Sequence, residues 1–159
     1  MANEIKRELT LTREFNAPRE LVWKAWTDPK LITKWWGPRG VTTPTCDVDA
    51  RVGGKMYIVM LAGKELGPFA GKEWPMKATI EEFVPPERMV SISEPLDEQM
   101  GIMLEVKNTL TLEEQGNKTK MTLHMVVTKV TKMGEFAVAG MEQGWNQSLD
   151  KLGELLGGM

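Results

Sequence analysis

The C-terminal part of the chain has the hydrophobic pattern of one long amphipathic helix. From Gly134 to Leu156, apolar side chains recur every three or four residues and form one stripe. The stripe consists of Met141, Trp145, Leu149, Leu152 and Leu156. One flank of it carries only small residues, namely Ala137, Gly140, Gly144 and Ser148. A glycine inside a helix costs roughly 1 kcal/mol relative to alanine, so the two glycines predict either very close packing or space left open beside the helix.

Most of the remaining chain alternates between apolar and polar residues, which is typical of strands with one buried face. The alternation predicts seven strands, at Ile5–Phe15, Val41–Val48, Lys55–Ala62, Trp74–Val84, Arg88–Ser93, Ile102–Leu112 and Lys118–Val130. Between the first two strands the period becomes helical. Two short helices are predicted there, the first beginning at Pro18 and the second capped by Asp28.

This order of elements, β-α-α-β-β-β-β-β-β-α, predicts an α+β protein. Short links between successive strands favour an antiparallel meander. A seven-stranded sheet must cover its apolar face, and the C-terminal helix is the only predicted element long enough to do so. We therefore expect one domain over residues 1–159, with the helix-grip fold: a curved antiparallel sheet around the long helix, closed at one end by the two short helices.

Several sequence motifs follow one another in the order known from one protein family. They are Phe15–Pro29 (FNAPRELVWKAWTDP), Trp35–Pro38 (WWGP), Asp49–Gly54 (DARVGG), Pro85–Arg88 (PPER) and Gly144-Trp145. In these motifs the chain resembles the heat-shock-protein-90 ATPase activator homologue (AHSA-like) family of the START-like (SRPBCC) helix-grip superfamily. The resemblance implies the fold that the periodicity predicts, and a superfamily that includes lipid-transfer domains and polyketide cyclases. The eukaryotic co-chaperone has a further N-terminal domain that this chain does not supply, so its ATPase-stimulating role is not carried over.

Composition narrows the possible partners. The net charge of −2, without a basic cluster, provides no general attraction to nucleic acid. The longest apolar run, Met56–Ala62, is too short to span a membrane, so we expect no membrane insertion. The N-terminus has no signal-peptide pattern and the chain has one cysteine, which favours a reducing compartment. We therefore expect a cytoplasmic protein.

No catalytic, metal or cofactor site is predicted. The chain has one cysteine, Cys46, and one histidine, His124, which excludes a zinc cluster built on these residue types. The two lie on separate predicted strands, with His124 on the solvent side, so a thiol dyad is not expected. Arg13 is the one charged residue predicted on an apolar strand face. It lies on the apolar side of the first strand, where it needs a carboxylate partner or an anionic ligand group.

The interior is predicted to be deformable and to leave a cavity. The chain has twelve methionines and six tryptophans, and methionine adapts its shape to irregular space. Strand parity and the helix stripe select the lining residues, with an ordinary dry core as the alternative for any one of them. The predicted lining consists of Trp35, Trp36, Met56, Met60, Trp74, Met76, Met121, Met125, Met141, Gly144 and Trp145.

Three hypotheses for function follow. The first is a non-enzymatic domain that binds a small apolar or amphipathic molecule between sheet and helix. The second is a chaperone- or stress-linked interaction module, with a protein partner or a homodimer, because the strand segment Met56–Leu61 is apolar on both faces. The third is a cyclase- or hydrolase-like enzyme. It needs a polar group inside the cavity, for which Arg13 and Glu73 are the candidates.

Overall fold

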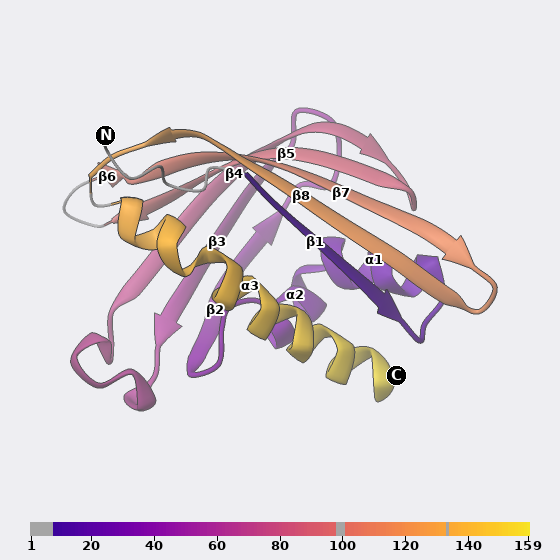
Figure 1. Cartoon of the computed structure of the whole chain (residues 1–159), viewed down its shortest axis with the longest axis horizontal. Coiled ribbons are helices and arrows are strands. Elements are labelled where there is room, and N and C mark those ends of the chain that lie inside the picture. The colour runs from indigo at the N-terminus through magenta and orange to yellow at the C-terminus, as the bar shows by residue number, and fades with distance from the viewer. Residues whose placement is uncertain (1–7, 98–100, 133) are drawn as a thin grey trace.

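The fold is one curled antiparallel sheet that wraps around a long helix (Figure 1). The computed structural model describes residues 8–97, 101–132 and 134–159. The strands are β1 (Glu8–Phe15), β2 (Val41–Val48), β3 (Lys55–Ala62), β4 (Glu73–Val84), β5 (Arg88–Asp97), β6 (Gly101–Ile102), β7 (Leu104–Gln115) and β8 (Lys118–Val130). Seven of them follow the order β1-β8-β7-β5-β4-β3-β2, and β6 pairs only with β5. The predicted α+β helix-grip fold is confirmed.

Four described strand boundaries differ from the prediction: β4 begins at Glu73, β5 ends at Asp97, and β7 runs from Leu104 to Gln115. The segment after Ser93 was expected to be a loop, but β5 continues to Asp97. The reason is local pairing, because Leu96 lies opposite Ile102 and the two short segments hold each other extended. Ile102 therefore belongs to β6 rather than to the strand that follows. Residues 5–7, predicted as the start of the first strand, lie outside the described residues.

The two short helices form where the sequence predicts them. They are α1 (Arg19–Thr27), which follows Pro18, and α2 (Pro29–Trp35). The Asp28 side chain caps α2 by accepting a hydrogen bond from the Lys30 backbone N–H at 2.9 Å. In addition, the loop between β3 and β4 contains one 3-10 turn, η1 (Lys64–Phe69). Because α2 packs against both β2 and the C-terminal helix, it closes one end of the curled sheet.

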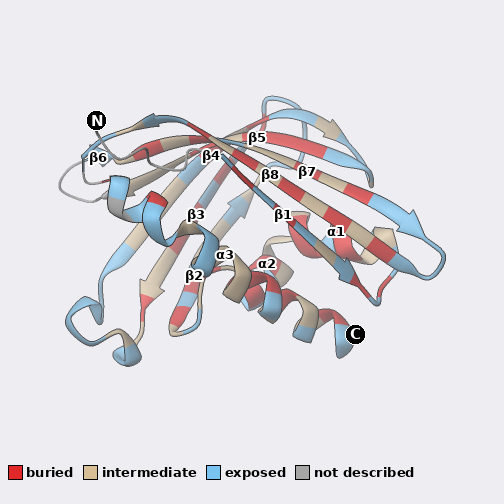
Figure 2. Cartoon of the chain, viewed as in Figure 1, coloured by how far each residue is buried: buried red, intermediate tan, exposed pale blue. Residues whose placement is uncertain are grey.

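The C-terminal helix α3 (Gly134–Gly157) covers the inner face of the sheet unevenly. Its C-terminal half is seated in the core, where Leu149 and Leu152 are fully buried. In its N-terminal half Val138 is buried, whereas Ala137 and Gly140 are exposed (Figure 2). None of the described helices is long and apolar enough to cross a membrane.

The two helix glycines face open space. A Cβ atom added at Gly140 or at Gly144 would meet no neighbouring atom of the described residues within 4 Å. Close packing against this flank is therefore excluded within the described chain. Ser148, expected on the same open flank, is instead buried, and its hydroxyl donates to the Gly144 carbonyl oxygen at 3.2 Å. The small flank thus separates into an open part up to Gly144 and a packed part from Ser148 onwards.

We expect the two halves of α3 to contribute unequally to stability. Leu152→Ala leaves a cavity in the sealed core and lowers the free energy of unfolding by about 2–5 kcal/mol. Met141→Ala, at a half-buried position, costs less than half of that. Urea titrations of both variants measure the difference. Equal losses would contradict the uneven seating of the helix.

Candidate functional site

Four tryptophans join the helices at the closed end of the sheet. Trp26 stacks on Trp145, with ring centroids 5.9 Å apart. Trp36 lies edge-on to Trp145 at 5.2 Å and beside Trp35 at 5.5 Å. The Trp35 ring is fully buried and its Nε1–H donates to the Ala25 carbonyl oxygen at 2.9 Å, whereas Trp36 is half-buried. Of these two adjacent tryptophans, one therefore enters the core and the other lies at its edge.

The inner face of the sheet is apolar but incompletely covered at one end. In the pairing of β3 with β4, Met60 lies opposite Trp74, and the neighbouring position on β4 along the same face is Met76. All three side chains are half-buried, whereas Ala78 and Ile80, further along β4 on the same face, are buried. We call Met60, Trp74 and Met76 the mouth, because the face changes there from sealed to accessible.

The predicted lining residues fall into two groups. The first is sealed in the hydrophobic core and contains Trp35, Met56, Met121 and Met125. The second keeps accessible surface and contains Trp36, Met60, Trp74, Met76, Met141, Gly144 and Trp145. Only the second group has surface that a ligand can contact without rearranging the core.

Three polar residues on the inner face were missed by the sequence reasoning. Ser91 and Ser93 lie on β5 and Asn108 lies on β7, at positions paired with buried core residues of neighbouring strands. Asn108 Nδ2 donates to Ser93 Oγ at 2.9 Å and to the Val106 carbonyl oxygen at 3.3 Å. A signal was present in the sequence, because Asn108 has the parity of the apolar residues Val106 and Leu110 on either side of it.

Arg13 has the carboxylate partner that its position requires. Its guanidinium donates to Asp150 Oδ1 at 2.7 Å and to the backbone and side-chain oxygens of Asn146 at 3.1 Å each. It therefore ties β1 to α3 at the edge of the core. Glu73, the other candidate for an internal polar group, is exposed. Neither residue supplies a free charge to the interior.

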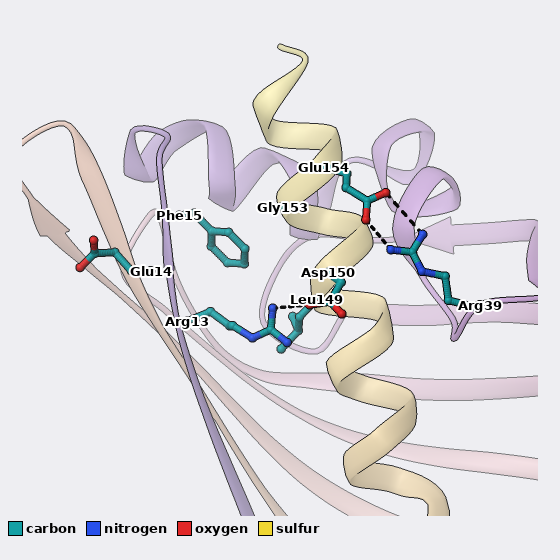
Figure 3. A pocket seen from close by; sticks show the side chains of 8 residues that line it. All are labelled: Arg13, Glu14, Phe15, Arg39, Leu149, Asp150, Gly153 and Glu154. Atoms are coloured by element: carbon teal, nitrogen blue, oxygen red, sulfur yellow. Dashed lines mark hydrogen bonds and ion pairs between the residues drawn. The ribbon is translucent and has the colours of Figure 1, made fainter.

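A hollow of about 500 Å³ opens beside Arg13, between β1 and the C-terminal half of α3 (Figure 3). It is lined by Arg13, Glu14, Phe15, Arg39, Leu149, Asp150, Gly153 and Glu154. Both arginines are occupied, Arg13 by Asp150 and Arg39 by Glu154. The hydrogen bond from Arg39 lowers the pKa of Glu154 below its ordinary value. The side chain of Glu14 points away from α3 (Figure 3).

A second hollow, of about 280 Å³, lies where β6 meets β7 and β8. It is lined by Glu94, Ile102, Met103, Leu104, Glu105, Lys129, Val130 and Thr131. None of the eleven predicted lining residues borders either hollow. Both are therefore separate from the mouth.

Cys46 and His124 do not meet. Cys46 lies on β2 at one edge of the sheet, and His124 lies on β8 near the other edge. The His124 ring nitrogen Nε2 is 2.6 Å from Glu8 Oε1. Burial, reinforced by the charge of Asp47, raises the pKa of the Cys46 thiol from 9.0 to about 11. Within the described ranges, no three His, Cys, Asp or Glu residues are grouped so that they could hold a metal ion.

Comparison with known proteins connects this arrangement to one family. The sequence pattern of the family described as "Activator of Hsp90 ATPase homolog 1-like protein" matches residues 16–157. No protein of curated function matches the chain.

Solved bacterial structures share the fold. A crystal structure from Nitrosomonas europaea is 24% identical, with a TM-score of 0.75 over 97% of this chain and 96% of that one. A solution structure from Arthrobacter aurescens is 22% identical, with a TM-score of 0.81 over 99% and 91% of the two chains. The AHSA1 protein of Silicibacter pomeroyi is 24% identical, with a TM-score of 0.77 over 94% and 97%. At this level of identity the likeness establishes the fold alone.

The Cys46 thiol reports on the apolar interior. A pKa raised from 9.0 to about 11 lowers the thiolate fraction at pH 8 about a hundredfold, so iodoacetamide alkylates the folded protein about 100 times more slowly than the urea-unfolded chain. Because the folded-state pKa is the higher one, the contribution of this thiol to stability is complete below pH 9 and is lost as the pH rises from 9 to 11. Mass spectrometry follows the reaction, with Cys46→Ser as the blank. Equal rates in the folded and unfolded chains would contradict the assignment.

Proposed function

The chain belongs to the family of activator of Hsp90 ATPase homolog 1-like proteins, and we propose that it binds a small apolar or amphipathic molecule between the inner face of the sheet and α3. The fold of this family is one that binds ligands or proteins in general. The incompletely covered mouth supports a ligand in particular. Met60, Trp74 and Met76 share the face that elsewhere forms the core, yet they remain half-buried.

Apolar surface left uncovered in this way favours an apolar occupant. Each 100 Å² of apolar surface removed from water contributes about 2.5 kcal/mol. The helix side adds room, because no atom of the described residues lies within 4 Å of a Cβ added at Gly144. Trp145 follows Gly144 in the chain and Trp36 lies edge-on to it at 5.2 Å, so both rings can add apolar surface to the proposed site. Residues of both the sheet and the helix thus support one site.

The hypothesis of a protein-interaction module has less support. It rested on the apolar outer face of β3, which carries Tyr57, Val59 and Leu61. Val59 is buried and Leu61 half-buried, so only Tyr57, which is 42% exposed, offers substantial surface. The enzymatic hypothesis needs a polar group inside the cavity. Arg13 is engaged by Asp150, and Glu73 is exposed, so neither of these two residues supports it.

Binding of N-phenyl-1-naphthylamine, an uncharged dye that fluoresces in apolar sites, tests the proposal. The protein is expected to bind this dye, and Gly144→Leu is expected to weaken binding at least tenfold by filling the site. The variant should still fold, because leucine has a higher helix propensity than glycine and its Cβ meets no described atom within 4 Å there. Fluorescence titration and thermal unfolding measure the two effects.

Gly157→Leu is the matched control. It makes the same substitution on the same helix, also at a position without a neighbour within 4 Å among the described residues, but at the far end from the mouth. It should bind the dye as the unmodified protein does. Normal dye binding by Gly144→Leu, or equal loss in both variants, would count against the proposed site.

A further inference from the structure

We infer that the site takes an uncharged amphipathic ligand whose polar group, a hydroxyl or a carboxamide, is held by Asn108 and Ser91 on the inner face of the sheet. This inference rests on the proposed function and specifies the class of its ligand. It comes from the polar side chains that interrupt an otherwise apolar face.

The polar residues lie in the centre of the sheet. One row across the strands consists of Ile80, Ser91, Asn108 and Met125, each paired with the next. The adjacent row contains Ala78, Ser93, Val106 and Val127. The apolar members of both rows belong to the hydrophobic core, so the serines and the asparagine share the face that looks towards α3.

The hydrogen bonds within this group determine which atoms are left for a ligand. The two N–H groups of Asn108 are used, one by Ser93 Oγ and one by the Val106 carbonyl oxygen. A carbonyl oxygen can only accept, so this contact establishes which end of the amide is nitrogen. Asn108 Oδ1 therefore points elsewhere, and it accepts no hydrogen bond from the part of the chain that the structure describes.

Ser91 supplies the complementary group. Its side chain is only 9% exposed, and its hydroxyl has no hydrogen-bond partner among the described residues. The buried side-chain N and O atoms that have no partner among the described residues are Arg19 Nε and Trp26 Nε1, so the Ser91 hydroxyl keeps accessible surface that a ligand can contact. Ser91 lies directly opposite Asn108, and side chains at such cross-strand positions are about 5 Å apart. A donor and an acceptor are thus within reach of one small polar group.

The absence of charge on this part of the face selects the ligand class. On the face that carries Ser91 and Asn108, the neighbouring positions are Ile80, Ser93, Val106, Leu110 and Met125, all uncharged. The described arginines closest to α3 are engaged by carboxylates. An ammonium or carboxylate group placed here would lose its hydration without gaining a counter-charge. A hydroxyl both donates and accepts, which matches Asn108 Oδ1 and the Ser91 hydroxyl.

The position of the group relative to the mouth gives the orientation of the ligand. Along β4, the partner of Ser91 is Ile80, four residues from Met76 and six from Trp74. At ~3.3 Å per residue, these distances are about 13 and 20 Å. The polar group of the ligand thus lies deepest, and its apolar chain extends towards the mouth.

Displacement of bound N-phenyl-1-naphthylamine by ten-carbon compounds tests the inference on the full chain. At pH 7.5, 1-decanol and decanamide should displace the dye at concentrations at least tenfold lower than decanoate or decylammonium. Asn108→Leu removes one net hydrogen bond and should weaken decanol binding about three- to tenfold. The dissociation constant of the dye is measured separately in each variant, and the decanol constant is calculated against it.

Two further variants make the outcome decisive. Ser91→Ala is a smaller change that should also weaken decanol binding. It replaces Asn108→Leu as the test variant if Asn108→Leu does not fold. Thr109→Val, the next residue on β7 and on the opposite face, is the matched control and should leave decanol binding unaltered.

The possible failures are distinguishable. If the dye does not bind to the unmodified protein, the proposed function and this inference both fail. A second outcome is that the dye binds, but decanol binds equally well to the unmodified protein, to Asn108→Leu and to Ser91→Ala. In that case the proposed function is supported and the inferred polar contact is overturned. Tighter binding of decanoate than of decanol would also overturn it. Lower thermal stability of Asn108→Leu with unchanged decanol binding would mean that Asn108 only supports the fold.

Discussion

The whole structure depends on one helix that covers the inner face of a seven-stranded sheet. At 24 residues, α3 is about 36 Å long, which lets it reach from one end of the curl to the other. Its leucines lie only in the C-terminal half, where Leu149, Leu152 and Leu156 are buried and Leu155 is half-buried. The N-terminal half has alanine and glycine where leucine would be needed for equal coverage. The uneven distribution of side-chain volume along one helix therefore makes one end of the domain a core and leaves the other end open.

Charged and neutral polar residues occupy different places around this helix. The ion pairs Arg13–Asp150 and Arg39–Glu154 lie at the rim of the C-terminal half, where solvent reduces the cost of charge. The buried polar residues of the described chain are all neutral, namely Thr43, Ser91, Ser93, Thr119 and Ser148, and the half-buried Asn108 and Cys46 are neutral as well. An interior that accommodates neutral hydrogen-bonding groups and excludes charges suits an alcohol or an amide better than an ion.

Membership of the family and the shared fold do not by themselves define this site. Proteins only 22–24% identical retain the same architecture over more than nine-tenths of their length, and one fold serves many functions. The proposed ligand site depends on single positions, such as Asn108 within an apolar stripe or Gly144 on a helix flank. The functional argument therefore rests on these side chains and their contacts rather than on the fold.

The sequence by itself determined seven strands, three helices, their order and the fold, though not β6 or η1, because apolar periodicity is a local property that each longer strand and helix displays independently. It also identified the stripe of α3 and the need of Arg13 for a carboxylate partner or an anionic ligand group. Only the tertiary structure decided that Asp150 is that partner, that the helix glycines face open space, and that Ser91 lies opposite Asn108. These facts depend on strand register and on the seating of α3, which bring together residues far apart in the chain. Local pattern carries no information about such distances.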